Sequence, residues 1–70
     1  MDNYIKINYK GKEYIGQIES IQSTWESVIK PDYSRDLRLQ YYSVAIIEKD
    51  TNVHIKDIII NSFSEIKPYN

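Results

Sequence analysis

"DIIINSFSEIKP", residues 57–68, is the stretch that decides the fold. Its isoleucines at 58–60 end a β-like run, because β-branched side chains suit a pleated, half-buried surface. Asn61–Ser64 then predicts a tight or 3₁₀ turn, and Glu65–Lys67 predicts a last short strand before Pro68. The chain is therefore expected to close with a strand, a single helical turn and a short final strand.

Two alternating ribbons begin the chain. Tyr4–Tyr9 alternates apolar and polar residues and predicts a first strand. Gly11 predicts a hairpin, because glycine adopts a positive φ at little steric cost. Glu13–Ile21 predicts a second strand, in which Gly16 marks a bulge or a sharp bend. The residues of these strands expected to face inward are Ile5, Ile7, Tyr9, Tyr14 and Ile18, while the side to which Ile21 points stays open.

Two longer β-like runs follow in the second half of the chain. Leu37–Glu48 is the longest of them, and its inward row is expected to hold Tyr42, Val44 and Ile46. The polar break "KDTN" separates it from Val53–Ile60, which is a good hairpin partner. The sequence thus predicts five strands in one domain, residues 1–70.

The segment between the second and third strands, "STWESVIKPDYSRDLRLQ" (residues 23–40), differs from its flanks. Ser23 and Glu26 have capping-box spacing. Trp25, Val28 and Ile29 have the spacing of one helical face, and Pro31 disfavours helical geometry at the residue before it. The sequence therefore predicts a short helix or 3₁₀ turn here, followed by a loop over "PDYSRD".

This pattern of strands resembles the SH3-like barrel group, which includes Tudor and KOW-type modules. The resemblance rests on "KINYKGKEYIGQIESI" (6–21), "YYSVAIIEKDTNVHI" (41–55) and "DIIINSFSEIKP". It implies a small five-stranded barrel with residues 23–40 inserted at an edge whose loops commonly line the binding surface. Nothing in the chain is similar to the ALYDY-type motif of SH3 domains, so proline-rich peptide binding is not implied. A β-grasp or an OB-like barrel is the alternative fold.

Composition limits the functions open to the chain. It has 70 residues, a formal charge of −1, one His and no Cys. Disulfides and the usual zinc ligand sets are therefore not available, and no metal or cofactor is expected. The N-terminal residues have neither the pattern of a secretory signal nor that of a membrane span, so the expected location is cytoplasmic.

Catalytic constellations are weak in this sequence. His54 and Asp57 are the one tempting acid–base pair, but residues three apart on a strand point to opposite faces. Glu48 and Asp50 fit a solvated hairpin end better than a pair of catalytic or cation-binding carboxylates. The sequence holds no phosphate-binding glycine loop and no nucleophile elbow, so an enzyme is not expected.

The insert holds the residue types that are enriched at protein interfaces. One interpretation places Trp25, Val28 and Ile29 as a helical lid over the barrel, and the other makes this lid or its rim a recognition surface. The residues expected to contact a partner are Trp25, Tyr33, Arg35, Arg38 and Tyr41. The chain is accordingly interpreted as a non-enzymatic module that binds another protein, such as an inhibitor or accessory protein of a phage or mobile element.

Two other assignments stay open. Exposed tyrosines among lysines and arginines would suit a nucleic-acid-binding module of the KOW type, although acidic residues interrupt that surface. An outward row of Ala45, Ile47 and Ile59 would expose an apolar strip and would indicate a homodimer.

Overall fold

A computed structural model describes residues 3–69 of the chain. Its five strands form one antiparallel sheet with the order β4-β3-β2-β1-β5, so the predicted mainly β fold with five strands is confirmed. A single turn of 3₁₀ helix, η1, lies between the last two strands. The elements are β1 (Ile5–Tyr9), β2 (Lys12–Ile29), β3 (Arg35–Glu48), β4 (His54–Ile60), η1 (Phe63–Glu65) and β5 (Lys67–Pro68).

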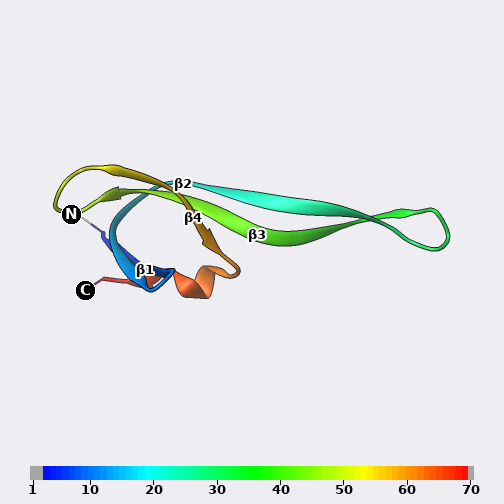
Figure 1. Ribbon diagram of the computed structural model, residues 1–70, viewed down its shortest axis with the longest axis horizontal. Coiled ribbons are helices and arrows are strands. Elements are labelled where there is room, and N and C mark those ends of the chain that lie inside the picture. The colour runs from blue at the N-terminus through cyan, green and yellow to red at the C-terminus, as the bar shows by residue number, and fades with distance from the viewer. Residues whose placement is uncertain (1–2, 70) are drawn as a thin grey trace.

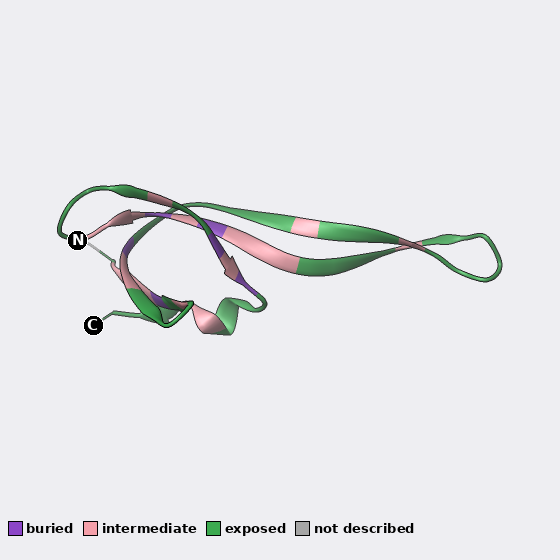
Figure 2. Ribbon diagram, viewed as in Figure 1, coloured by how far each residue is buried: buried purple, intermediate pink, exposed green. Residues whose placement is uncertain are grey.

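The core forms where the sheet bends and brings β1 opposite β4 (Figure 1). Its fully buried side chains come from β1, β3 and β4 (Figure 2). The predicted inward rows of β1 and β3 are confirmed, and Tyr14 also packs against this core. Ile18 is exposed instead, because it lies where β2 shifts its register against β3. The buried hydrophobic side chains are those of Ile7, Val44, Ile46, Ile58 and Ile60.

Gly16 lies in the bend of β2, as the sequence predicts. It is buried and pairs with Glu48 of β3, and the bulge follows between Ile18 and Ser20. A Cβ atom at Gly16 would lie 2.9 Å from the carbonyl carbon of Ile47 and still closer to its oxygen. The two backbones therefore approach more closely here than any side chain permits.

The predicted 3₁₀ turn is present as η1, and its first residues are held by a capping box. The Ser62 hydroxyl accepts a hydrogen bond from the Ser64 amide at 3.2 Å, and the Glu65 carboxylate accepts one from the Ser62 amide at 3.1 Å. Phe63 stacks on Tyr42 with ring centroids 4.3 Å apart. This turn therefore docks on the middle of β3, at the residue that pairs with the end of β4, and returns the chain to β1.

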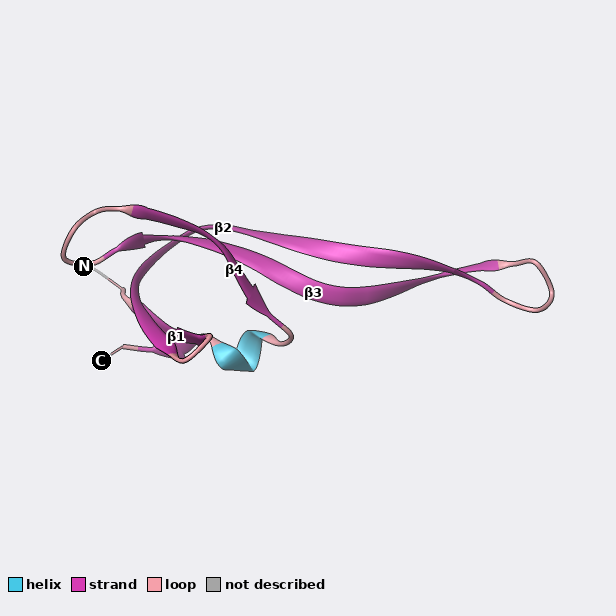
Figure 3. Ribbon diagram, in the orientation of Figure 1, coloured by secondary structure: helices cyan, strands magenta, loops and turns pink. Residues whose placement is uncertain are grey.

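The short helix predicted for the insert is wrong, because residues 23–29 continue β2 without interruption (Figure 3). The β-branched residues Thr24, Val28 and Ile29 and the aromatic Trp25 favour extended backbone, and β3 supplies the hydrogen-bonding partner. The Ser-x-x-Glu capping box forms at Ser62 instead of Ser23. The loop predicted over "PDYSRD" shrinks to a turn, and its last two residues begin β3.

The extended parts of β2 and β3 form a two-stranded arm, which we define as residues 24–41. Neither β1 nor β4 pairs with this segment, since their pairing ends at Gly16 and Tyr42. The arm gives the molecule extents of 52 × 25 × 18 Å (Figure 1). The radius of gyration is 15.3 Å, against about 11 Å expected for a compact domain of this length.

Replacing Gly16 by Ala should destabilise the protein, because the added methyl group meets the β3 backbone rather than a flexible side chain. We expect a loss of about 2 kcal/mol or more in the free energy of unfolding, measured by urea titration. Gly11→Asn is the matched control, since Gly11 has a φ of 77° with open space around it and Asn tolerates that conformation. Equal stability of the Gly16→Ala variant and the wild type would contradict the close approach.

Candidate functional site

The register of β2 and β3 gives the arm two faces of different character. Residues directly opposite one another in an antiparallel pair project to the same side, and successive residues alternate. Trp25 pairs with Leu39, Ser27 with Leu37, and Ile29 with Arg35, so these six side chains share one face. The same face continues toward the core, because Val44 of the core pairs with Ile21, four residues before Trp25.

This apolar face, which we define by Trp25, Ile29, Leu37 and Leu39, is open to solvent. The exposed fraction is 56% for Trp25, 64% for Ile29 and 67% for Leu37. At the base of the arm, Phe63 is also exposed where it stacks on Tyr42. The side of the sheet that is buried in the body thus continues onto the arm, where most residues are exposed (Figure 2).

The opposite face of the arm is polar and charge-balanced. Glu26 pairs with Arg38, and the side-chain amide of Gln40 donates a hydrogen bond to the Glu26 carboxylate at 3.2 Å. Nearer the tip, the Lys30 ammonium lies 4.0 Å from the Asp36 carboxylate. The charged residues of the arm are Glu26, Lys30, Asp32, Arg35, Asp36 and Arg38, which sum to zero.

A tight turn at the tip reverses the chain. The Tyr33 amide donates to the Lys30 carbonyl at 2.9 Å, and the Lys30 amide donates to the Ser34 carbonyl at 2.8 Å. The Asp32 carboxylate accepts hydrogen bonds from the amide and the hydroxyl of Ser34. Tyr33 has a φ of 67°, a left-handed conformation usually taken by Gly in such a turn. Its ring is 89% exposed, so no packing within the described chain explains a Tyr at this position.

The structure separates the five residues predicted to contact a partner. Trp25 and Arg35 lie on the apolar face, Tyr33 lies at the tip, and Arg38 and the half-buried Tyr41 belong to the polar face. The lid interpretation of Trp25 is wrong, because β2 carries this side chain away from the core. Sequence reasoning missed Leu37 and Leu39 as surface residues. Their alternation with Asp36, Arg38 and Gln40 was the available signal.

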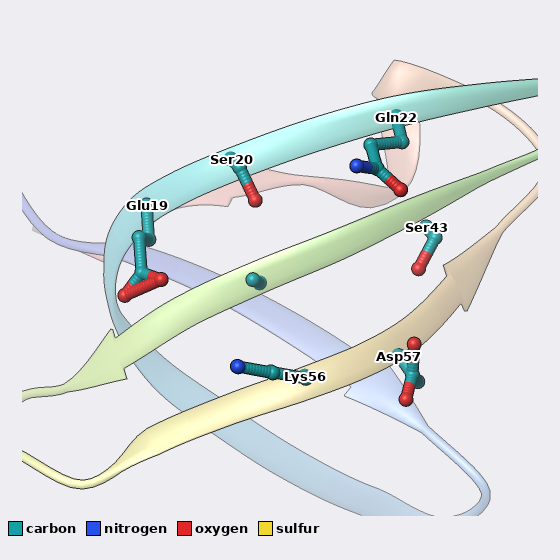
Figure 4. Close-up of a pocket in the computed structure, with 7 residues that line it drawn as sticks. Glu19, Ser20, Gln22, Ser43, Lys56 and Asp57 are labelled. Carbon is teal, nitrogen blue, oxygen red and sulfur yellow. The ribbon is translucent and has the colours of Figure 1, made fainter.

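The outer face of the sheet holds a shallow polar hollow (Figure 4). Side chains from β2, β3 and β4 surround it and carry charges of both signs. Beside it, His54 contacts the Glu19 carboxylate, and both side chains are open to solvent. The residues that line the hollow are Glu19, Ser20, Gln22, Ser43, Ala45, Lys56 and Asp57.

The row predicted to form an outward apolar strip is only partly exposed to solvent. Ala45, Ile47 and Ile59 lie on the outer face, but all three are half-buried. This row therefore exposes much less apolar surface than the arm does, and it does not support a homodimer.

Within residues 3–69, no group of three or more His, Asp or Glu side chains is arranged to hold a metal ion. No helix in the same part of the chain is long and apolar enough to cross a membrane. Comparison of the chain with protein-family models, with curated proteins and with solved structures gives no match.

The turn at the tip should respond to acid through Asp32. The two hydrogen bonds from Ser34 lower the pKa of Asp32, so they stabilise the turn above the ordinary carboxyl pKa and are lost as the pH falls through the lowered value. We expect the Ser34 amide resonance to titrate below about pH 4 in an NMR experiment. Asp32→Asn should abolish this titration. An Asp32 that titrates at or above the ordinary carboxyl pKa would contradict the hydrogen-bonded turn.

Replacing Tyr33 by Gly should stabilise the protein, because Gly adopts a φ near 67° without steric cost. We expect a gain of about 0.5–1 kcal/mol in the free energy of unfolding, since the relieved strain exceeds the added entropy of the unfolded chain. Tyr33→Ala removes the same exposed ring but keeps the strain, so chemical denaturation should show no gain for it. Equal effects of the two variants would exclude strain at this position.

Proposed function

We propose that the chain is a non-enzymatic binding module that acts by protein–protein contact through its arm. The observation that carries this proposal is the apolar face, in which Trp25, Ile29 and Leu37 stand more than half exposed on hydrogen-bonded strands. Large exposed apolar patches with polar rims mark interaction sites on soluble proteins. Here the charged residues lie on the opposite face of the same two strands, while Arg35 borders the apolar patch toward the tip.

The residues of the arm support a protein as the occupant. Trp, Tyr and Arg dominate the binding energy of protein interfaces, and Trp25, Tyr33 and Arg35 all lie on the apolar face or at the tip. The exposed Tyr33 ring in a strained conformation adds to this, since strain without internal packing is often kept for a contact.

The charge of the arm argues against nucleic acid as the occupant. Proteins that bind DNA or RNA neutralise phosphates with an excess of Lys and Arg. In the arm, three basic residues are matched by three acidic ones. Glu26 accepts a hydrogen bond from Gln40, and Asp36 lies beside Lys30. The arm therefore offers no net attraction for a phosphate backbone.

The topology supports a place in the SH3-like group as part of the same proposal. The hairpin of β3 and β4, followed by η1 and the short strand β5, is the succession of elements on which the resemblance rests, and the five strands form one sheet in the order β4-β3-β2-β1-β5. In this interpretation the arm is an extension of the hairpin between the second and third strands. A small accessory protein or inhibitor, as encoded by a phage or mobile element, would bind its target through such an extension.

Photo-crosslinking tests the proposal at neighbouring positions on opposite faces. We would place p-benzoylphenylalanine at Leu37, on the apolar face, and in a second variant at Arg38, on the polar face. Irradiation in native lysate should give covalent protein adducts from position 37 and far weaker ones from position 38. No protein adduct from position 37, or the same adducts from both positions, would overturn the proposal.

A further inference from the structure

We infer that the protein on the apolar face is a second copy of this chain, so that two arms pack face to face in a homodimer. This inference rests on the proposed function, because it names the partner for the same surface. Three independent properties of the arm lead to it, namely its area, its marginal stability when alone and the distribution of charge over its apolar face.

The accessible surface area of the chain exceeds that of a compact monomer by about the area that one partner contributes to a protein interface. The accessible surface is 5409 Å², whereas a monomer of 8.3 kDa is expected to expose about 4,600 Å². The excess of about 800 Å² equals the area that each partner buries in an interface of standard size. If one partner covered the arm, the accessible surface area of the chain would therefore fall to that of a compact folded protein of the same mass.

The arm on its own is also expected to be only marginally stable in water. A two-stranded hairpin is marginally stable by itself and needs a third strand or a packed face. Beyond Tyr42, no other strand of the described chain pairs with the arm, and the four residues of its apolar face are exposed. A second copy is the one protein that is present wherever the chain is made, so this cover does not depend on another gene product.

Charge on the apolar face favours an antiparallel arrangement of two identical arms. Arg35 is the one charged residue among the six side chains of this face, and it lies toward the tip. Two arms that point the same way would bring the two Arg35 side chains to the same level. When the arms point in opposite directions, Ser27 marks the centre and Trp25 lies over Ile29 and next to Arg35 of the second copy, where a guanidinium stacks well on an indole ring.

Sedimentation equilibrium of the purified chain tests the dimer, with variants that add the same charge to opposite faces. We expect the wild type and Gln40→Lys to dimerise, because Gln40 lies on the polar face. Leu37→Lys should weaken association at least tenfold, while circular dichroism shows that the strands are retained. A monomeric wild type at millimolar concentration, or equal association of the two variants, would overturn the inference.

Crosslinking between engineered cysteines tests the direction of the arms, since the chain has no Cys of its own. A short bismaleimide should link two copies of Ser27→Cys, at the centre of the interface. It should not link two copies of Tyr33→Cys. Tyr33 lies four residues from Leu37, the partner of Ser27, and at about 3.3 Å per residue this would place the two tips about 26 Å apart. Efficient linking at position 33 would contradict the antiparallel arrangement.

The outcomes separate this inference from the proposed function. If the purified chain is monomeric and the adducts from position 37 contain other proteins, the homodimer is overturned, but the proposed protein contact through the arm is retained. Failure to form any protein adduct from position 37 would overturn both.

Discussion

The long antiparallel pairing of β2 with β3 is the constraint on which the rest of the structure depends. It runs from Gly16 opposite Glu48 to Ile29 opposite Arg35. Near Gly16 the two backbones pass so closely that only a glycine fits, and the sheet bends there to bring β1 over β4. The same ladder builds the core at one end and the arm at the other, so the fold and the candidate binding surface share one set of hydrogen bonds.

Side-chain alternation gives this ladder one exposed apolar face on the arm. The side that buries Val44 and packs Tyr42 in the body carries Trp25 and Leu37 on the arm, where nothing in the described chain covers them. Apolar burial is the dominant favourable term in folding and association. The proposed assembly through the arm would cover the face that this chain of 70 residues leaves open.

Local chemistry predicts the body of the fold well. Ile7, Val44 and Ile46 follow from two-residue alternation, and the turn at Ser62 follows from its polar residues and short length. The segment around Trp25 does not follow, because its capping-box spacing and its β-branched content favour different structures. The partner strand at 35–39 decides between them, and this long-range pairing cannot be read from residues 23–29 alone. The choice of Trp25 and Arg35 as contact residues stands as a proposal, now on strands instead of a lid.

Residues 24–41 form an ordered two-stranded arm with Trp25 and Leu39 side by side on one open face. The NMR spectrum of the purified chain tests this directly through backbone shifts and cross-strand nuclear Overhauser effects. We expect strand-type shifts throughout the arm, with cross-strand effects between Ser27 and Leu37 and between Trp25 and Leu39. Helical shifts over residues 23–30, or averaged shifts of an unstructured loop, would contradict it.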